Sequence, residues 1–182
     1  MKFEKLSEKE KGYLFGLFEG DGYKVYDKKS RHYHIEFYLN SVKDKMIISF
    51  IVKILRKIGL NPNLYKDKRY NCIRVRVYSK ELFSIIHKDI KFNDKNRDFK
   101  IGFVSGMIDS EGYVNNKKRY IMIVNTNRKT LEKISQFLNS LGIGAKVNIQ
   151  NISQKDKLPS YRMHISVTFK NTNNLSIKAG ML

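Results

Sequence analysis

Cysteine is almost absent from this 182-residue chain, which contains Cys72 alone, together with only two prolines and no tryptophan. A single cysteine excludes an intrachain disulfide framework and a cysteine-rich zinc site, and it suits a reducing compartment. Acidic residues are also few, 17 against 36 lysines and arginines, which gives a formal net charge of +19. A charge of this sign and size favours a polyanionic partner. Because the basic residues are spread along the chain, we expect a charged face rather than a disordered basic arm.

Long apolar runs are missing as well. The most apolar stretch, residues 46–55, is interrupted by Lys53 and is too short to span a bilayer. Four charged residues near the start interrupt what would be the apolar part of a secretory signal: Lys2, Glu4, Lys5 and Glu8. We therefore expect an intracellular protein without a membrane partner, cytoplasmic in a prokaryote or organellar, and not secreted.

Two nine-residue stretches nearly repeat each other, LFGLFEGDG at residues 14–22 and VSGMIDSEG at residues 104–112. Each is an apolar helical run that ends at a carboxylate followed by glycine. The two carboxylates, Asp21 and Glu111, are 90 residues apart (111 − 21 = 90). A repeat of this length predicts two similar halves related by a pseudo-twofold axis, with one carboxylate from each half near that axis.

Small residues recur at every fourth position in both stretches: Gly12, Gly16 and Gly20, then Gly102, Gly106 and Ser110. A glycine inside a helix costs roughly 1 kcal/mol relative to alanine, so this spacing needs a compensating gain. Positions four apart share one helical face, where small side chains allow two backbones to approach closely. The sequence therefore predicts that the two motif helices pack directly on each other.

The two carboxylates are predicted at helix C-termini, because Gly22 and Gly112 stand where a left-handed residue would end each helix. There Asp21 and Glu111 meet the negative ends of the helix dipoles and each other's charge, and a divalent cation between them would relieve both penalties. Each stretch also contains an earlier acid on another helix face, which we interpret as structural: Glu19 and Asp109.

Both stretches resemble the signature motif of the LAGLIDADG homing endonucleases, and the two-motif layout is similar to their monomeric, single-chain members. The resemblance covers nearly the whole chain. It departs from the motif only within apolar or small classes, at Phe15, Val104 and Ser105. A basic residue that often begins the helix after the second strand in this family has no clear match, since Val42 and Asn127 occupy the nearest positions.

The resemblance implies an α+β fold of two pseudo-symmetric αββαββα halves. The antiparallel sheets would form a DNA-binding saddle, and the motif helices would pack at the pseudo-twofold axis. Asp21 and Glu111 would bind the catalytic metal, and the backbone carbonyls of Gly20 and Ser110 would join the coordination. Magnesium is the expected ion, with manganese able to substitute and calcium binding without turnover.

The hydrophobic pattern predicts the same order of elements twice. In the first half, a capping box at Ser7 and Glu10 opens the motif helix, which is followed by strands at 23–28 and 32–40, a helix at 42–58, strands at 63–68 and 71–78, and a helix at 79–87. The second half has a helix at 98–110, strands at 113–117 and 119–125, a helix at 128–141, and strands at 145–151 and 160–169. The charged segment 88–97 is predicted to link halves at 1–87 and 98–182.

Polar and apolar residues alternate in several strands, which predicts sheets with one packed face and one open face. The open faces are rich in donors suited to the major groove, where arginine reads guanine and asparagine reads adenine. The candidate DNA contacts are His32, His34, Glu36, Tyr38, Asn40, Arg74, Arg76, Tyr78, Lys117, Arg119, Asn125, Arg162, His164, Ser166, Thr168 and Lys170. A merely solvated polar face is the alternative, and a metal bound by the histidine pair 32 and 34 is less favoured than either.

Three functions are consistent with these patterns. The first is a monomeric, site-specific homing endonuclease that makes a metal-dependent double-strand cut in a long DNA site, with support from Lys43, Lys118 and Arg128. The second is an intron RNA maturase on the same fold. The third is a non-catalytic DNA-binding regulator. The presence of both acids favours the endonuclease, because a pure RNA binder has no use for two carboxylates in a basic groove.

Overall fold

The computed structural model describes residues 1–67, 69–87, 90–115, 117–149 and 159–166. The first half contains α1 (Glu8–Asp21), β1 (Gly22–Asp27), β2 (His32–Asn40), α2 (Lys45–Lys57), β3 (Asn63–Asp67), β4 (Cys72–Tyr78) and α3 (Lys80–Ile85). The second half contains α4 (Arg97–Glu111), β5 (Gly112–Asn115), β6 (Tyr120–Asn125), α5 (Arg128–Ser140), β7 (Ala145–Ile149) and β8 (Tyr161–Ser166). Short 3₁₀ turns occur at Phe3–Lys5 (η1) and Phe92–Asp94 (η2). The helix predicted to close the second half lies outside the described residues, as do the ends of the strands predicted at 145–151 and 160–169.

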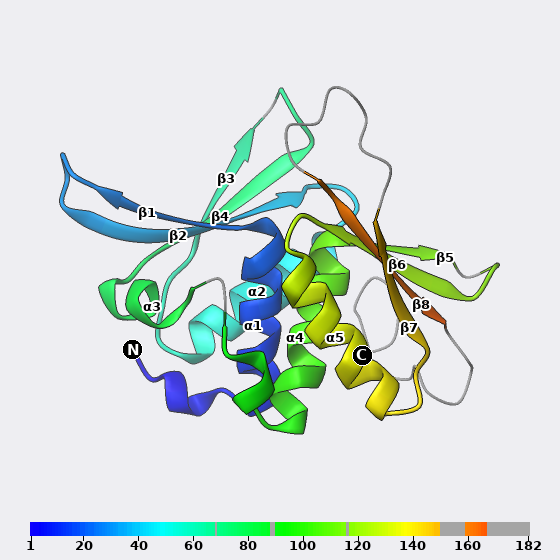
Figure 1. Cartoon of the computed structure of the whole chain (residues 1–182). Coiled ribbons are helices and arrows are strands. Elements are labelled where there is room, and N and C mark those ends of the chain that lie inside the picture. Colours follow the sequence, from blue (N-terminus) through cyan, green and yellow to red (C-terminus); the bar gives the residue numbers. More distant parts are fainter. Residues whose placement is uncertain (68, 88–89, 116, 150–158, 167–182) are drawn as a thin grey trace.

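The two halves repeat one sheet topology. Each has a four-stranded antiparallel sheet, ordered β1-β2-β4-β3 in sheet A and β5-β6-β8-β7 in sheet B. The register repeats too, because Gly22 pairs with Phe37 and Gly112 pairs with Ile123. Figure 1 shows α1 and α4 side by side at the centre, with one sheet to each side. The predicted α+β fold with two repeated halves is confirmed.

The helices α1 and α4 approach each other backbone to backbone. A Cβ atom added to Gly16 would lie 2.0 Å from the carbonyl oxygen of Phe103. One added to Gly106 would lie 2.3 Å from the carbonyl oxygen of Tyr13. Two further glycines are equally close to the facing backbone, Gly12 and Gly102. The predicted packing of the small-residue faces is therefore confirmed.

The glycines that follow the two acids do not adopt the left-handed conformation predicted for them. Gly22 has φ −90° and ψ 143°, and Gly112 has φ −86° and ψ 142°, which is extended backbone. Each helix runs straight into a strand, so no reversal of the chain is needed. Glycine is required instead by space, because a Cβ atom at Gly22 would lie 2.4 Å from the carbonyl oxygen of Phe18.

Helix α2 begins at Lys45, three residues later than predicted. The side-chain oxygen of Asn40 accepts hydrogen bonds of 2.9 Å from the backbone N–H groups of Val42 and Lys43. The carboxylate of Asp44 in turn accepts a 2.9 Å hydrogen bond from the backbone N–H of Asn40. These side-chain bonds stabilise a turn over residues 41–44 in competition with the helix.

The described part of the predicted linker, residues 90–97, is packed against the rest of the protein. It contains η2, in which Phe92 is 2% exposed. The ring of Phe92 makes edge contacts with Phe103 at 5.3 Å and with Phe137 at 5.9 Å between centroids. The connection is therefore packed against the second half, although its sequence is mostly charged.

The inner faces of the sheets form the core with the helices. Alternate residues of the central strands are at most 1% exposed: Ile35, Phe37, Val75 and Val77 in sheet A, and Ile121, Ile123, Met163 and Ile165 in sheet B. The opposite faces carry the polar residues, as the alternation predicted. Over the described ranges, no helix is both long and apolar enough to cross a membrane.

Candidate functional site

Asp21 and Glu111 are the last residues of α1 and α4, at the helix ends from which β1 and β5 start. A Cβ atom added to Gly20 would lie 2.2 Å from Oγ of Ser110 and 2.8 Å from Cγ of Glu111. The side chain of Glu111 thus lies against the residue that precedes Asp21. Both acids are partly exposed. The structure therefore brings Glu111 to the end of α1 that carries Asp21, at the junction of the halves.

The oxygen donors at this junction fit a hard divalent cation whose remaining coordination positions are filled by the substrate. Among the described residues, no group of three or more His, Cys, Asp or Glu side chains is placed to hold a metal. The predicted ligands are the carboxylates of Asp21 and Glu111 and the carbonyls of Gly20 and Ser110. Carbonyls in the last turn of a helix lack a partner within that helix. Magnesium is commonly held by one or two carboxylates together with substrate phosphates, rather than by an all-protein cage.

The earlier acid of each motif has a structural partner. Asp109 is 0% exposed and accepts a 2.9 Å hydrogen bond from the hydroxyl of Tyr13. Glu19 is 6% exposed and accepts a 3.2 Å bond from Nδ2 of Asn127. Burial, and then the charge of Asp109, raises the pKa of Tyr13. The structural interpretation of both acids is confirmed.

The three basic residues predicted to support catalysis lie in different places. Lys43 is exposed in the turn before α2, and Arg128 is exposed at the start of α5. The Nε of Arg128 donates to Glu132 at 2.6 Å. Lys118 lies in the turn beyond β5, so roughly 10 Å of strand separates it from Glu111.

The outer face of sheet A is the face turned away from the helices. His32, Tyr38 and Tyr78 are exposed on it, and Arg74 and Arg76 are partly exposed. Two other predicted DNA contacts belong to the same face but are covered, Glu36 at 2% and His34 at 8% exposed. Side chains this deeply covered present little surface to a base.

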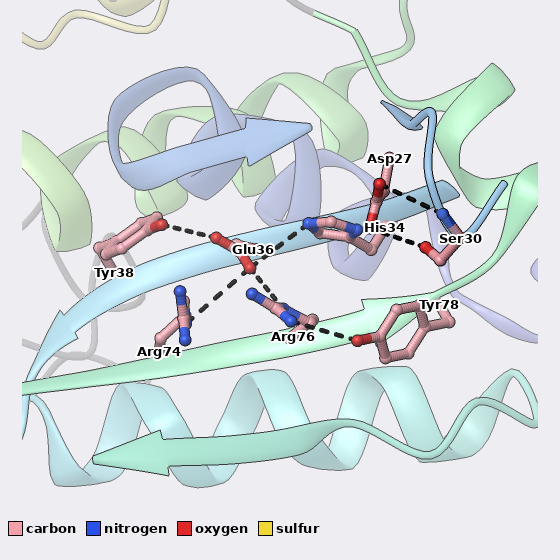
Figure 2. A network of polar contacts seen from close by, with 8 residues as sticks. All are labelled: Asp27, Ser30, His34, Glu36, Tyr38, Arg74, Arg76 and Tyr78. Atoms are coloured by element: carbon pink, nitrogen blue, oxygen red, sulfur yellow. Dashed lines mark hydrogen bonds and ion pairs between the residues drawn. The ribbon is translucent and has the colours of Figure 1, made fainter. Parts of the chain in front are cut away.

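Glu36 is the centre of a polar network on this face (Figure 2). Its carboxylate accepts the hydroxyl of Tyr38 at 2.5 Å and the Nε of Arg76. The Nε of Arg74 lies 3.9 Å from the same carboxylate, and Nε2 of His34 lies 3.5 Å from it. Burial alone would raise the pKa of Glu36, but the hydrogen bonds from Tyr38 and Arg76 bring it below its usual value. The carboxylate is therefore ionised at neutral pH.

The predicted DNA contacts of sheet B that the structure describes are exposed or partly exposed. Lys117, Arg119 and Ser166 are exposed, and Arg162 and His164 are partly exposed. Two candidates fall outside the described residues, Thr168 and Lys170. Asn125 uses its side-chain oxygen to accept the N–H of Asn127 at 2.8 Å, as Asn40 does in the first half. Both asparagines therefore help to shape the turn before a helix.

The sequence patterns did not single out two tyrosines that each stand two residues after one of the acids. Tyr23 is 58% exposed and Tyr113 is 54% exposed, each immediately after the motif glycine. They pair with Glu36 and Met122, respectively, across the neighbouring strands. Their spacing was the available signal, since 113 − 23 = 90 residues is also the spacing of the acids.

Comparison with known families and proteins adds to this geometry. The family model described as the LAGLIDADG-like domain matches residues 8–91 and 98–169. The chain belongs to the LAGLIDADG family. Two uncharacterized proteins of Methanocaldococcus jannaschii, MJ0398 and MJ0314, are each 32% identical to this LAGLIDADG protein and cover 77% and 72% of it. The alignments cover 51% and 54% of those proteins, so the chain spans about half the length of the curated relatives it matches.

Solved structures show where else the fold occurs. The homing endonuclease I-DmoI in complex with DNA and Ca has a TM-score of 0.74 and 21% identity, over 95% of this LAGLIDADG chain and 96% of that one. The N-terminal LAGLIDADG domain of DUF199/WhiA has a TM-score of 0.59 and 16% identity, over 90% and 78% of the two chains. Because one fold serves proteins of both descriptions, the fold by itself does not fix the activity.

Proposed function

We propose that this LAGLIDADG protein is a site-specific endonuclease that cuts both strands of a long DNA duplex by metal-dependent hydrolysis of phosphodiester bonds. The observation that supports the proposal is that Asp21 and Glu111, one acid from each repeat, end the two helices α1 and α4 that pack on each other. A pair related by pseudo-twofold symmetry suits the two strands of a duplex, which are themselves related by a twofold axis.

The metal requirement is supported by the chemistry of the site. A divalent ion bound there would supply Lewis acidity and lower the pKa of an attacking water. Asp21 and Glu111 would hold and orient it through their carboxylate oxygens, and the phosphates of the DNA would complete the coordination. Structures of I-DmoI with DNA are described with Ca, with Mn and with Mg, which agrees with hard oxygen ligands.

The protein's own charges would hold the duplex. The chain carries a net charge of +19, and the basic residues of the sheets lie on faces that the helices leave open. Lys43 lies in the turn after β2, Arg128 begins α5, and both would contact phosphates of the bound duplex. No comparison supports the alternative of an RNA partner, since the similar structures that name a nucleic acid name DNA.

The test separates chemistry from binding. Asp21→Asn and Glu111→Gln keep nearly the same volume but remove the charge that would hold the cation. Each is expected to abolish or cripple double-strand cleavage in magnesium while DNA binding is unchanged or slightly tighter, because repulsion from phosphate is also removed. The control is Glu4→Gln, which removes an exposed carboxylate in η1 and should leave cleavage unchanged. Wild-type cleavage by the double variant Asp21→Asn, Glu111→Gln would falsify the proposal.

Calcium provides a second arm of the same experiment. It should support binding without cleavage, because its looser and higher coordination fits the same oxygens with a different geometry. A wild-type protein that binds its preferred duplex but cuts neither strand in magnesium or manganese would instead be a non-catalytic regulator.

A further inference from the structure

The two arginines in the middle of β4 are held in place by the rest of the sheet. Arg76 bonds Glu36 through Nε and the hydroxyl of Tyr78 through Nη1 at 3.1 Å. The guanidinium groups of Arg74 and Arg76 also lie over one ring, that of Tyr65, at 5.2 and 5.1 Å from its centroid. A carboxylate on one side and an aromatic ring on the other thus restrict both side chains (Figure 2 shows the carboxylate side).

Although these contacts restrict both side chains, part of each guanidinium group remains available to a ligand. Arginine has five N–H donors in a planar fork. Within the described chain, the contacts of Arg76 use Nε and Nη1, so its Nη2 group has no protein partner. The side chains of Arg76 and Arg74 are 21% and 36% exposed, on the face opposite the core. The two restricted arginine side chains therefore present guanidinium N–H donors at the surface.

The described strands of sheet B do not contain this arrangement. The shared register places Met122 where sheet A has Glu36, and His164 where it has Arg76, because Phe37 and Ile123 are equivalent partners of the motif glycines. Arg162 is the counterpart of Arg74. Among the described residues, its Nε has no hydrogen-bond partner although it is buried. A methionine offers no charge that could fix a guanidinium.

We propose that Arg74 and Arg76 form a guanine-reading pair on sheet A, and that Glu36 is the positioning residue that aims them. The ligand is the O6 and N7 edge of guanine in the major groove, which arginine binds with two parallel hydrogen bonds. The arginines are two residues apart on one strand, about 7 Å, which matches roughly two base-pair steps of about 3.4 Å each. Glu36 acts through the arginines and touches no base. Guanine preference in the DNA site is therefore concentrated in the half under sheet A.

This inference rests on the proposed DNA binding, and its test uses binding alone. The wild-type protein would first select its preferred sites from a random duplex library in calcium. We expect the selected sites to carry guanine at the positions where Arg74→Ala and Arg76→Lys relax the base preference. Replacing that guanine by 7-deazaguanine, which lacks the N7 acceptor, should weaken wild-type binding by roughly 5- to 150-fold, the usual range for one bidentate contact.

Glu36→Gln then tests the positioning role. It should relax guanine preference at the same positions only, and leave the preference under sheet B and the slope of affinity against salt unchanged. Because Glu36 acts through Arg76, the variant should add little in the Arg76→Lys background. Glu4→Gln again serves as the matched loss of one carboxylate and should change no base preference.

The outcomes separate the two proposals. Selection of a duplex site whose guanines do not respond to Arg74→Ala or Arg76→Lys overturns the guanine pair while DNA binding stands. Unchanged guanine preference in folded Glu36→Gln overturns the positioning role, and so does a loss of preference spread evenly over the site. Failure of the wild type to bind any duplex overturns the proposed function itself.

Discussion

The hydroxyl of Tyr13 donates a 2.9 Å hydrogen bond to the buried carboxylate of Asp109, which lies 96 residues further along the chain. The bond crosses the interface between α1 and α4. It cannot occur twice, because the residue equivalent to Tyr13 in the second repeat is Phe103 (103 − 13 = 90). The hydrogen bond between Tyr13 and Asp109 therefore breaks the pseudo-symmetry of this interface.

Removing that hydroxyl should weaken the fold. Tyr13→Phe deletes a hydrogen bond to a charged group that is 0% exposed, so the free energy of unfolding should fall by about 1–3 kcal/mol. Denaturant titration at neutral pH measures the change. Tyr23→Phe is the matched control, since Tyr23 is 58% exposed and should change the free energy by less than about 0.5 kcal/mol. Equal values for the two variants would contradict the role of the bond.

The same tyrosine predicts a dependence on alkaline pH. The pKa of Tyr13 is raised in the folded protein by burial and by Asp109, whereas an unfolded tyrosine titrates near about pH 10. Above that pH the unfolded chain loses this proton and the folded chain keeps it, so stability must fall as pH rises. The wild type should therefore lose more stability between pH 9 and 11, roughly spanning the tyrosine pKa, than Tyr13→Phe does. Parallel curves for the two proteins would refute the raised pKa.

The helix interface should not tolerate a single methyl group. Gly106→Ala would place Cβ 2.3 Å from the carbonyl oxygen of Tyr13, which forces the helices apart and should cost about 1–3 kcal/mol or more. Gly144→Ala is the control, because its Cβ would be 3.7 Å from the nearest atoms. Thermal melts of both variants measure the difference. A stable Gly106→Ala protein with unchanged DNA cleavage would show that the close contact is dispensable.

Binding to DNA should depend steeply on salt. If the open faces neutralise about six to ten phosphates, affinity should fall by roughly 10³- to 10⁵-fold between about 50 and 200 mM salt. Fluorescence anisotropy with a labelled duplex measures the slope. Neutralising one phosphate contact, by Lys43→Gln or Lys117→Gln, should reduce the slope by about one. A flat response to salt would rule out a groove lined with phosphate contacts.

One chain should act alone. The two motif helices already supply each other with a partner, so a second copy has no equivalent surface to cover. Sedimentation of the free protein should therefore give the mass of a monomer, 21.4 kDa, and one protein should bind each duplex. A stable dimer would contradict this arrangement.

The local and repeating features of the molecule were readable from the sequence. Ser7 and Glu10 form the predicted capping box, with bonds of 2.8 and 3.2 Å between each side chain and the other residue's backbone N–H. The repeat at 90-residue spacing predicted the helix pair and the equivalent positions of Asp21 and Glu111 at the helix ends, because spacing within a helix fixes which residues share a face. Alternation in β2 and β4 predicted the open faces for the same reason, since side chains along a strand alternate between its two sides.

Only the tertiary structure decided what lies over those residues. Gly22 is extended rather than left-handed because α1 runs directly into a strand, a geometry set by the sheet and not by the glycine. The alternation of β2 assigns Glu36 to the outer face, but its burial comes from Arg76 and Tyr38, which register and side-chain direction bring over it. Lys118 lies in the turn beyond β5, a position that is set by the length of that strand. The periodicity of a sequence specifies on which side of a helix or strand a residue lies. The side chains that cover that residue come from other strands, and their positions are fixed only when the strands pair.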